Sequence, residues 1–175
     1  MQKITWTLLV LVLLAACSGV PDSKPVEKYT IEQFYKNKSI GGGQFNSEGT
    51  KLLVSSNETG IYNVYTLPVD GTAPTQLTNS TVESNFAVSF IPNSEKFIFS
   101  ADKGGNENSH LYLNDGNGNT KDLTPNENSS NSFFGWAKDK QSFFYGSNKR
   151  DPRFFDIYEM NIAELEKENP VSQMF

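Results

Sequence analysis

Apolar residues in this sequence gather in short runs that recur along the chain. The clearest runs are three triplets: Leu52-Leu53-Val54, Phe97-Ile98-Phe99 and Phe143-Phe144-Tyr145. A strand with one face in water alternates apolar and polar side chains, whereas a consecutive run is expected where both faces are buried. Each triplet therefore predicts a central strand that is covered on both sides.

Each triplet belongs to a repeat of about 46 residues. The aromatic residues Phe45, Phe90 and Trp136 precede the triplets at intervals of 45 and 46 residues. A second strand signal ending in tyrosine follows in every copy: Asn63-Val64-Tyr65, His110-Leu111-Tyr112 and Asp156-Ile157-Tyr158. Leu77-Thr78 and Leu123-Thr124 then match each other, and Pro170-Val171 is the nearest counterpart in the third copy. These signals together predict four short strands per repeat.

Turn-forming residues separate the predicted strands: Asn46-Ser47-Glu48-Gly49, Pro92-Asn93-Ser94-Glu95, Asp70-Gly71 and Asp115-Gly116. Asp-Gly between β runs is a strong hairpin signal, and four strands in a period near 46 are typical of a β-propeller blade. We therefore predict an all-β fold, a partial β-propeller of about three four-stranded antiparallel blades. The repeats cover residues 40–80, 85–126 and 131–175, and a two-sheet sandwich with similar strand spacing is the alternative.

Three blades are fewer than a closed propeller needs, since closed propellers have four to eight. Three would leave an edge with unpaired backbone groups and exposed blade faces. We expect residues 29–175 to be an incomplete propeller. The chain is then either a fragment of a longer protein or a small unit that closes its ring by assembling with other copies.

Composition narrows the functional classes. The 175 residues allow one domain or part of one. The formal net charge of -5, without a long basic run, argues against nucleic acid as a partner. Aromatic residues make up 13% of the chain, which is enough for a core. One cysteine and one histidine exclude a disulfide framework and a Cys/His zinc site, and we predict no cofactor and no metal.

The amino terminus reads as an export signal over residues 1–16. Lys3 is followed by an apolar run from Ile4 to Leu14, which is shorter than the roughly 20 residues of a membrane-spanning helix. Leu14-Ala15-Ala16-Cys17 resembles the bacterial lipobox, which implies cleavage before Cys17 and acylation of that residue. A plain signal peptide with an incidental cysteine is the alternative.

The predicted lipid on Cys17 would anchor the exported chain to a membrane of the cell envelope. Ser18 stands where lipoproteins retained at the inner membrane often have aspartate, which favours the outer membrane, facing the periplasm or the surface. Residues 17–28 contain Pro21, Pro25 and several charges with few large apolar groups, and we expect them to form a flexible tether.

The repeats resemble the WD40-like propeller repeats of TolB and of the prolyl oligopeptidase-type serine peptidases. Asp156-Ile157-Tyr158, Leu77-Thr78 and Leu123-Thr124 match that pattern closely, and the turns after Phe45, Phe90 and Trp136 match it loosely. The lead-in from Tyr29 to Gly42 and the loop from Asn148 to Phe155 look like the propeller of bacterial dipeptidyl-peptidase-like members.

The peptidase resemblance implies a propeller that gates the access of peptides to an α/β-hydrolase domain and docks that domain, which is absent from this chain. The serine elbow Gly-x-Ser-x-Gly of such hydrolases is absent from the sequence, so no catalytic residue carries over and the chain should be inactive alone. Whether the parent protein is an enzyme is left open. The alternative is a TolB-like periplasmic propeller that binds a protein or a cell-envelope component without enzymatic activity.

The remaining candidates for chemistry are weak. His110 has no nucleophile or orienting acid near it in the sequence, so we expect a histidine at the surface or at a blade edge. The run from Asp115 to Thr120 starts like a calcium loop but lacks the required glycine and glutamate, which favours a solvated hairpin. Gly41-Gly42-Gly43 is expected to let the chain bend into the first blade. The loop from Lys149 to Arg153 is expected to be a solvated turn, or alternatively a contact with a partner domain.

Overall fold

The computed structural model describes residues 26–167 and 170–175. The predicted signal peptide, Cys17 and most of the predicted tether lie outside the described residues. The chain divides into two compact units, residues 1–37 and 38–175. No helix in the described part of the chain is long and apolar enough to cross a membrane.

The described residues of the first unit contain one short helix, α2 (Ile31–Tyr35). It lies in the segment that the sequence suggested as a lead-in. Thr30 caps it: the Thr30 hydroxyl accepts from the backbone N–H of Gln33, and the Gln33 side chain accepts from the backbone N–H of Thr30 at 2.7 Å. This reciprocal pair satisfies two donors that a helix leaves open at its start.

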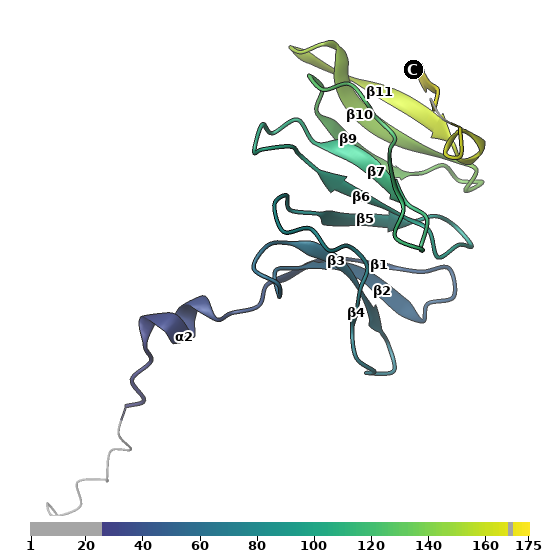
Figure 1. Cartoon of the computed structure of the whole chain (residues 1–175). Helices are drawn as coiled ribbons and strands as arrows, with labels where there is room; N and C mark the ends of the chain where they lie inside the picture. Colours follow the sequence, from purple (N-terminus) through teal and green to yellow (C-terminus); the bar gives the residue numbers. More distant parts are fainter. Residues whose placement is uncertain (1–25, 168–169) are drawn as a thin grey trace, which may run out of the picture. The chain divides into compact units, whose positions relative to one another are not determined.

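The second unit contains three four-stranded antiparallel sheets, which we call blades 1, 2 and 3 (Figure 1). Blade 1 consists of β1 (Ile40–Phe45), β2 (Lys51–Ser56), β3 (Asn63–Pro68) and β4 (Thr75–Gln76). Blade 2 consists of β5 (Phe86–Phe90), β6 (Phe97–Ala101), β7 (His110–Asn114) and β8 (Thr120–Asp122). Blade 3 consists of β9 (Asn131–Trp136), β10 (Ser142–Asp151), β11 (Phe154–Asn161) and β12 (Ser172–Met174). The predicted all-β architecture is confirmed.

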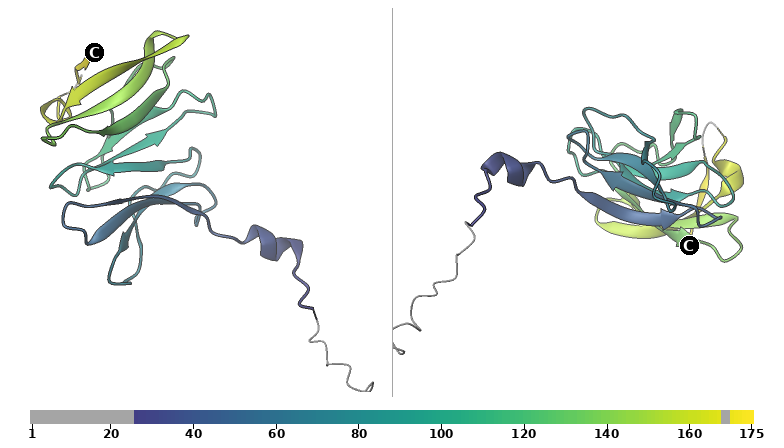
Figure 2. Two further views of the ribbon diagram at one scale, coloured as in Figure 1. Left: turned by 180° about the vertical axis from the view of Figure 1, so that it is seen from behind. Right: turned by 90° about the horizontal axis from the view of Figure 1, so that it is seen from below.

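The three sheets lie in layers, with blade 2 between blades 1 and 3 (Figures 1 and 2). In blade 2 the whole triplet is buried. Because side chains on consecutive strand residues point to opposite faces, both faces of β6 are covered. Phe97 and Phe99 pack with residues of blade 1, and Ile98 packs with residues of blade 3. The prediction of a strand covered on both sides holds here.

The third triplet departs from this prediction. Phe143 and Tyr145 are buried against blade 2, but Phe144 between them is only half-buried. Phe144 points to the opposite face of β10, where the described residues include no further sheet. Burial of alternate strand residues therefore depends on a neighbouring layer, and the triplet alone could not show whether that layer is present.

The repeat also governs strand register. Phe45, Phe90 and Trp136 each pair with the first residue of the following triplet. In each blade the pairing of the first two strands also has a register irregularity a few residues before this aromatic residue. Their surroundings differ, because Phe90 is buried whereas Phe45 is exposed. The aligned aromatic residues are thus equivalent in backbone position and unequal in burial.

The fourth strand of blade 3 lies later in the chain than the sequence suggested. We expected its counterpart at Pro170-Val171, but β12 begins at Ser172. The backbone N–H of Phe175 donates to the carbonyl of Ile157 at 3.0 Å, as that of Leu123 donates to Leu111 at 2.8 Å. The correction has a local cause: the link between β11 and β12 contains the 3₁₀ helix η1 (Ile162–Glu164) and is longer than the links in the other blades.

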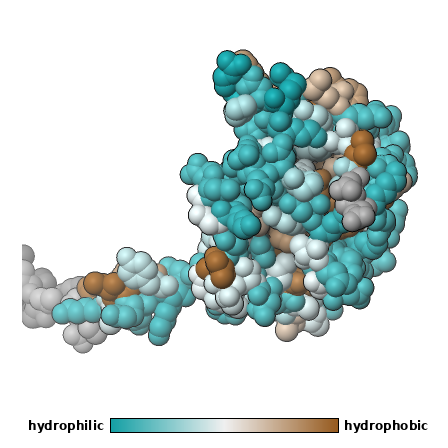
Figure 3. Space-filling model, turned by 45° about the horizontal axis from the view of Figure 1, so that its top comes forward, coloured by the Kyte–Doolittle hydropathy of each residue, from teal (hydrophilic) through white to brown (hydrophobic). Residues whose placement is uncertain are grey.

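Hydrogen bonds from and to side chains also join neighbouring blades. Ser55 of blade 1 accepts from the backbone N–H of Ala87 in blade 2 at 2.8 Å. The indole N–H of Trp136 in blade 3 donates to the buried hydroxyl of Ser89 in blade 2 at 2.8 Å. The surface that Figure 3 brings forward is mostly hydrophilic, with hydrophobic side chains in separate patches.

Candidate functional site

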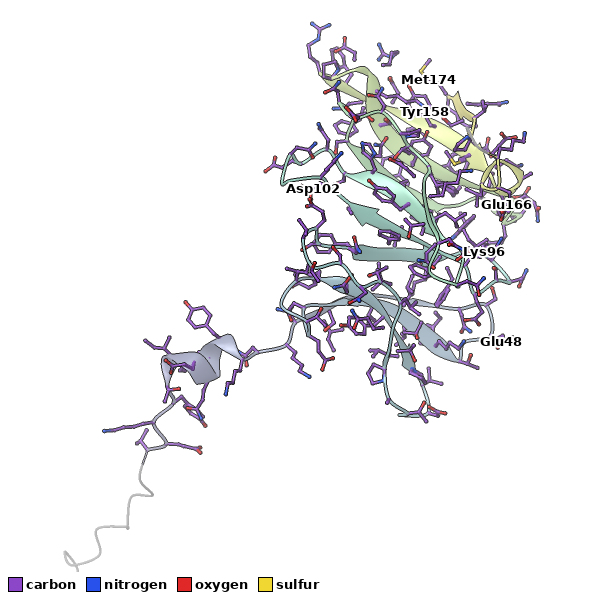
Figure 4. The ribbon with its side chains drawn as sticks, viewed as in Figure 1. Glu48, Lys96, Asp102, Tyr158, Glu166 and Met174 are labelled. Carbon is purple, nitrogen blue, oxygen red and sulfur yellow. The ribbon has the colours of Figure 1, made fainter. Side chains whose placement is uncertain are left out.

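A polar cavity of about 470 Å³ lies against blade 2. Its lining combines both charge signs with amides and two rings: Lys103, Asn106, Asn108, His110, Tyr112, Asp122, Glu127 and Asn128. These residues come from β7, from β8, and from the loops that precede β7 and follow β8. Figure 4 shows Asp102, at the start of the first of these loops, at the opposite end of the sheet from Lys96. The cavity therefore lies at the end of blade 2 that carries Asp102.

His110 and Asp122 form the centre of this cavity. Asp122 pairs with Tyr112 in the sheet register, and its Oδ2 lies 2.6 Å from Nδ1 of His110. The other carboxylate oxygen accepts from the backbone N–H of Thr124 at 2.8 Å. Because a carboxylate only accepts, Nδ1 of His110 carries the proton. Nε2 has no hydrogen-bond partner among the described residues and is the ring nitrogen left for a ligand.

Tyr112 supplies a phenol beside this pair. Its ring stacks on Phe99 at 5.3 Å between centroids and on His110 at 6.1 Å. Burial, followed by the negative charges of Asp122 and Glu83, raises the pKa of the Tyr112 hydroxyl. The phenol is therefore neutral at physiological pH and can donate a hydrogen bond.

The loops around the cavity are tied to one another. The Asn108 side chain donates to the carbonyl of Glu127 at 3.2 Å, which joins the loop before β7 to the segment after β8. Glu83 accepts from the backbone N–H of Gly104 at 2.9 Å, and Asp102 accepts from that of Glu107 at 3.2 Å. These bonds fix the rim of the cavity. The side chains of Lys103 and Asn106 are exposed there, and that of Asn106 accepts from the backbone N–H of Asn108 at 3.0 Å.

The cavity is suited to recognition by hydrogen bonds. It offers an imidazole nitrogen, a phenol, an ammonium group, carboxylates and amides. Within the described residues, no serine, threonine or cysteine side chain lines it, so His110 has no such hydroxyl or thiol to activate there. The orienting acid that the sequence did not reveal is Asp122, and only the pairing of β7 with β8 brings it to His110.

The other repeats also place a polar residue where blade 2 has His110. Asn63 of blade 1 is buried and bonds with the hydroxyl of Thr78 at 2.9 Å. Asp156 of blade 3 pairs with the guanidinium of Arg150. The bond joins the third strand to the fourth-strand segment in blades 1 and 2, whereas in blade 3 it joins β11 to β10. The free ring nitrogen within a cavity is particular to His110.

The calcium-like run forms a closed hairpin turn. Asp115 accepts from the backbone N–H groups of Asn117 and Asn119 at 2.8 and 3.1 Å. The hydrogen bond from the Asn119 side chain lowers the pKa of the Asp115 carboxyl most, and the bonds from these backbone groups lower it further. Within residues 26–167 and 170–175, no group of three His, Cys, Asp or Glu residues could hold a metal ion.

The glycine run and the charged loop have structural roles in this fold. Gly42 and Gly43 have φ values of 78° and 135° and lie at the irregularity of β1, as the expected bend requires. Lys149 to Arg153 extend the β10–β11 hairpin, where Arg150 pairs with Asp156 and Arg153 with Asp151.

Lys149 departs from the solvated turn that we expected from Lys149 to Arg153, because its side chain is half-buried. Its Nζ lies 2.8 Å from the Ser172 hydroxyl and 3.2 Å from that of Tyr145. It also lies 3.8 Å from the ring centroid of Tyr158, a cation–π distance. Burial lowers the pKa of the Lys149 ammonium. A second, smaller cavity of about 160 Å³ is lined by Lys149 and by residues of blades 2 and 3.

Comparison with known proteins shows the fold. The crystal structure of TolB from Acinetobacter baumannii superposes with a TM-score of 0.61 at 18% identity, over 78% of this chain and 32% of that one. The structure of putative TolB from Agrobacterium tumefaciens gives a TM-score of 0.57 at 16% identity, over 75% and 45% of the two chains. The chain has a TolB-like propeller fold.

The TolB-like likeness covers a part of each of these structures, since the chain spans about a third of the first and less than half of the second. No protein family model matches the sequence, and no curated protein matches it. The TM-scores support the fold, and sequence identities of 16–18% do not transfer residues or activities.

Proposed function

We propose that this chain is the propeller portion of a cell-envelope protein and that it binds a protein or an envelope component without catalysing a reaction. The observation that carries the proposal is the blade 2 cavity. Hydrogen bonds to the backbone fix its rim, and its lining combines donors and acceptors of both charge signs with the His110 ring, whose Nδ1 is bonded to Asp122. Such a site suits recognition of a polar segment by hydrogen bonds.

The TolB-like fold supports this proposal over a gating role in a peptidase. Solved structures that superpose on the blades include TolB from Acinetobacter baumannii and a putative TolB from Agrobacterium tumefaciens. The peptidase reading of the sequence, with a docked hydrolase domain and a peptide substrate, stays a prediction. The DNA that follows the codon of Phe175 tests it: a serine elbow in a hydrolase domain would support the peptidase, whereas further blades alone would support the binding module.

A site-specific crosslink tests the binding role. A photoreactive amino acid at Asn106, on the exposed rim of the cavity, should give a discrete crosslinked product in intact cells. The same group at Thr72, in the exposed turn after β3, serves as the control and should give none. In the Asn106 background, His110→Gln should abolish the product. Equal products from both positions, or a product that His110→Gln leaves unchanged, would refute a role for this cavity.

The amino-terminal motif supports a membrane anchor for the same protein. We propose that Cys17 carries lipid and holds the propeller at the cell envelope, with the outer membrane as the favoured location. The lipobox-like sequence before Cys17 supports this part of the proposal, and fatty-acid labelling, described below, tests it.

A further inference from the structure

The smaller cavity beside Lys149, which we call the Lys149 cavity, contains a half-buried positive charge. It has a volume of about 160 Å³ and is lined by residues of blades 2 and 3. Its wall comes from the segment after β8, from β9 and β10, and from the chain at the start of β12. No aspartate or glutamate in the described part of the chain lines it. The described lining therefore has one positive charge and no negative one.

The Lys149 ammonium group is held by neutral partners in the described part of the chain. Its Nζ lies 2.8 Å from the Ser172 hydroxyl and 3.2 Å from that of Tyr145. On another side it lies 3.8 Å from the ring centroid of Tyr158, which Figure 4 labels. Asp156, two residues before Tyr158, is already paired with a guanidinium. A half-buried charge without an opposite charge costs free energy, so an anion in the cavity would stabilise it.

Ser172 presents a hydroxyl proton beside this charge. Its Oγ accepts from the Tyr145 hydroxyl at 2.7 Å and from the Lys149 ammonium at 2.8 Å. Because both lone pairs of Oγ are used, the Ser172 proton is left to be donated, and it has no acceptor among residues 26–167 and 170–175. A bond from a cation polarises the hydroxyl and strengthens it as a donor. Ser172 is therefore suited to bind an anion.

Other polar side chains of the wall already accept hydrogen bonds or are enclosed. The Thr124 hydroxyl accepts from the backbone N–H of Leu111 at 3.0 Å, and Oδ1 of Asn126 accepts from that of Asn128 at 3.2 Å. The amide nitrogen of Asn126, which is exposed, has no acceptor among the described residues. Asn131 is 2% exposed, and its Oδ1, which has no donor in that part of the chain, is buried within the wall. The accessible side chains thus mainly offer donors.

The size and the apolar part of the lining narrow the class of anion. A single ammonium group balances one negative charge, whereas a phosphate group carries about −1.5 to −2. Leu123, Pro125 and Pro170 give the cavity an apolar wall beside its donors. The volume of about 160 Å³ is smaller than the roughly 300–1,000 Å³ of sites for drug-sized ligands. These features fit a singly charged acid group on a short carbon chain.

We propose that the Lys149 cavity binds a short-chain monocarboxylate. The carboxylate accepts from the Ser172 hydroxyl and balances the charge of Lys149. The carbon chain lies against Leu123, Pro125 and Pro170. This site is separate from the blade 2 cavity, because no described residue lines both.

Butyrate tests the proposal, with butyramide as its neutral analogue of similar shape. Ligand-observed NMR titration of the full chain should show butyrate binding about tenfold more tightly than butyramide, because the amide has no charge for Lys149 to balance. Lys149→Gln should weaken butyrate binding about tenfold for the same reason. Ser172→Ala should weaken it about fivefold, and it keeps the test valid if Lys149→Gln does not fold. Lys103→Gln, in the blade 2 cavity, is the matched control and should leave butyrate binding unchanged.

Several results would overturn the proposal. They are the absence of butyrate binding, equal affinities for butyrate and butyramide, tighter binding of inorganic phosphate than of butyrate, and equal losses in Lys149→Gln and Lys103→Gln. Glu168, which lies outside the described residues, precedes Pro170 by two positions. Tighter butyrate binding by Glu168→Gln would show that a carboxylate of the chain itself is the partner of Lys149. None of these results depends on whether the blade 2 cavity binds a protein or an envelope component.

Discussion

At the scale of single residues, the bond between His110 and Asp122 fixes the blade 2 cavity. Asp122→Asn should lower the free energy of unfolding by about 1–2 kcal/mol, because a hydrogen bond from His110 to a charged group is replaced by a neutral one. Urea denaturation of residues 18–175 would measure the change. Glu48→Gln removes one charge at an exposed position and should leave the stability nearly unchanged; an equal loss in both variants would contradict the assigned pair.

The pairing of Arg150 with Asp156 lowers the pKa of the Asp156 carboxyl, near the turn of the β10–β11 hairpin. The bond from Arg150 holds the pKa of Asp156 below its usual value of 3.8. Arg150→Gln should raise that pKa toward 3.8, observed by NMR titration of the carboxyl carbon. Arg153→Gln should leave the pKa of Asp156 in place and raise that of Asp151, whose main partner is Arg153.

The lowered pKa of Asp156 also predicts a direction for stability. The contribution of the Arg150–Asp156 bond to the free energy of unfolding is fully present above pH 3.8. It is lost as the pH falls through the pKa of Asp156 in the folded protein, which lies below 3.8. The Arg150→Gln protein should therefore lose less stability in this acid window than the parent. A steeper acid loss in the variant would contradict the assignment. The pair is exposed, so high salt should reduce the difference.

At the scale of elements, the stack of sheets is stabilised by side chains that lie between blades. Leu111→Ala should cost about 2–5 kcal/mol, because Leu111 is fully buried between blades 2 and 3. Ile157→Ala, at the equivalent position of blade 3, should cost less than about 1 kcal/mol in residues 18–175, because Ile157 is exposed there. Urea denaturation of both variants measures the contrast, and similar costs would show that the blades are not stacked as described.

At the scale of the whole molecule, the predicted lipid on Cys17 would decide where the propeller is held. Cys17→Ser should abolish incorporation of a labelled fatty acid and release the protein from the membrane fraction, because Cys17 is the single cysteine of the chain. Ser18→Ala is the matched control and should retain both the label and the membrane association. Label that persists in Cys17→Ser would exclude the predicted anchor.

The sequence by itself determined the repeat, and with it the sheets. Aromatic residues, apolar triplets and Asp-Gly turns each specify local backbone conformation, and their recurrence at about 46 residues fixes the blade as the unit. This is why three blades and most strand positions could be predicted. The fourth strand of blade 3 was misplaced because the long link through η1 breaks the repeat there, and no local signal marks Ser172–Met174.

Only the tertiary structure decided what the repeated positions contact. Val64, Leu111 and Ile157 are equivalent in sequence, yet the first two are fully buried and the third is exposed, because burial depends on the next layer. The pairing of His110 with Asp122 has the same origin, since strand register joins residues that the sequence separates by twelve positions. Local patterns specify strands, whereas contacts between strands and layers create the cavity and decide which of the equivalent positions are buried.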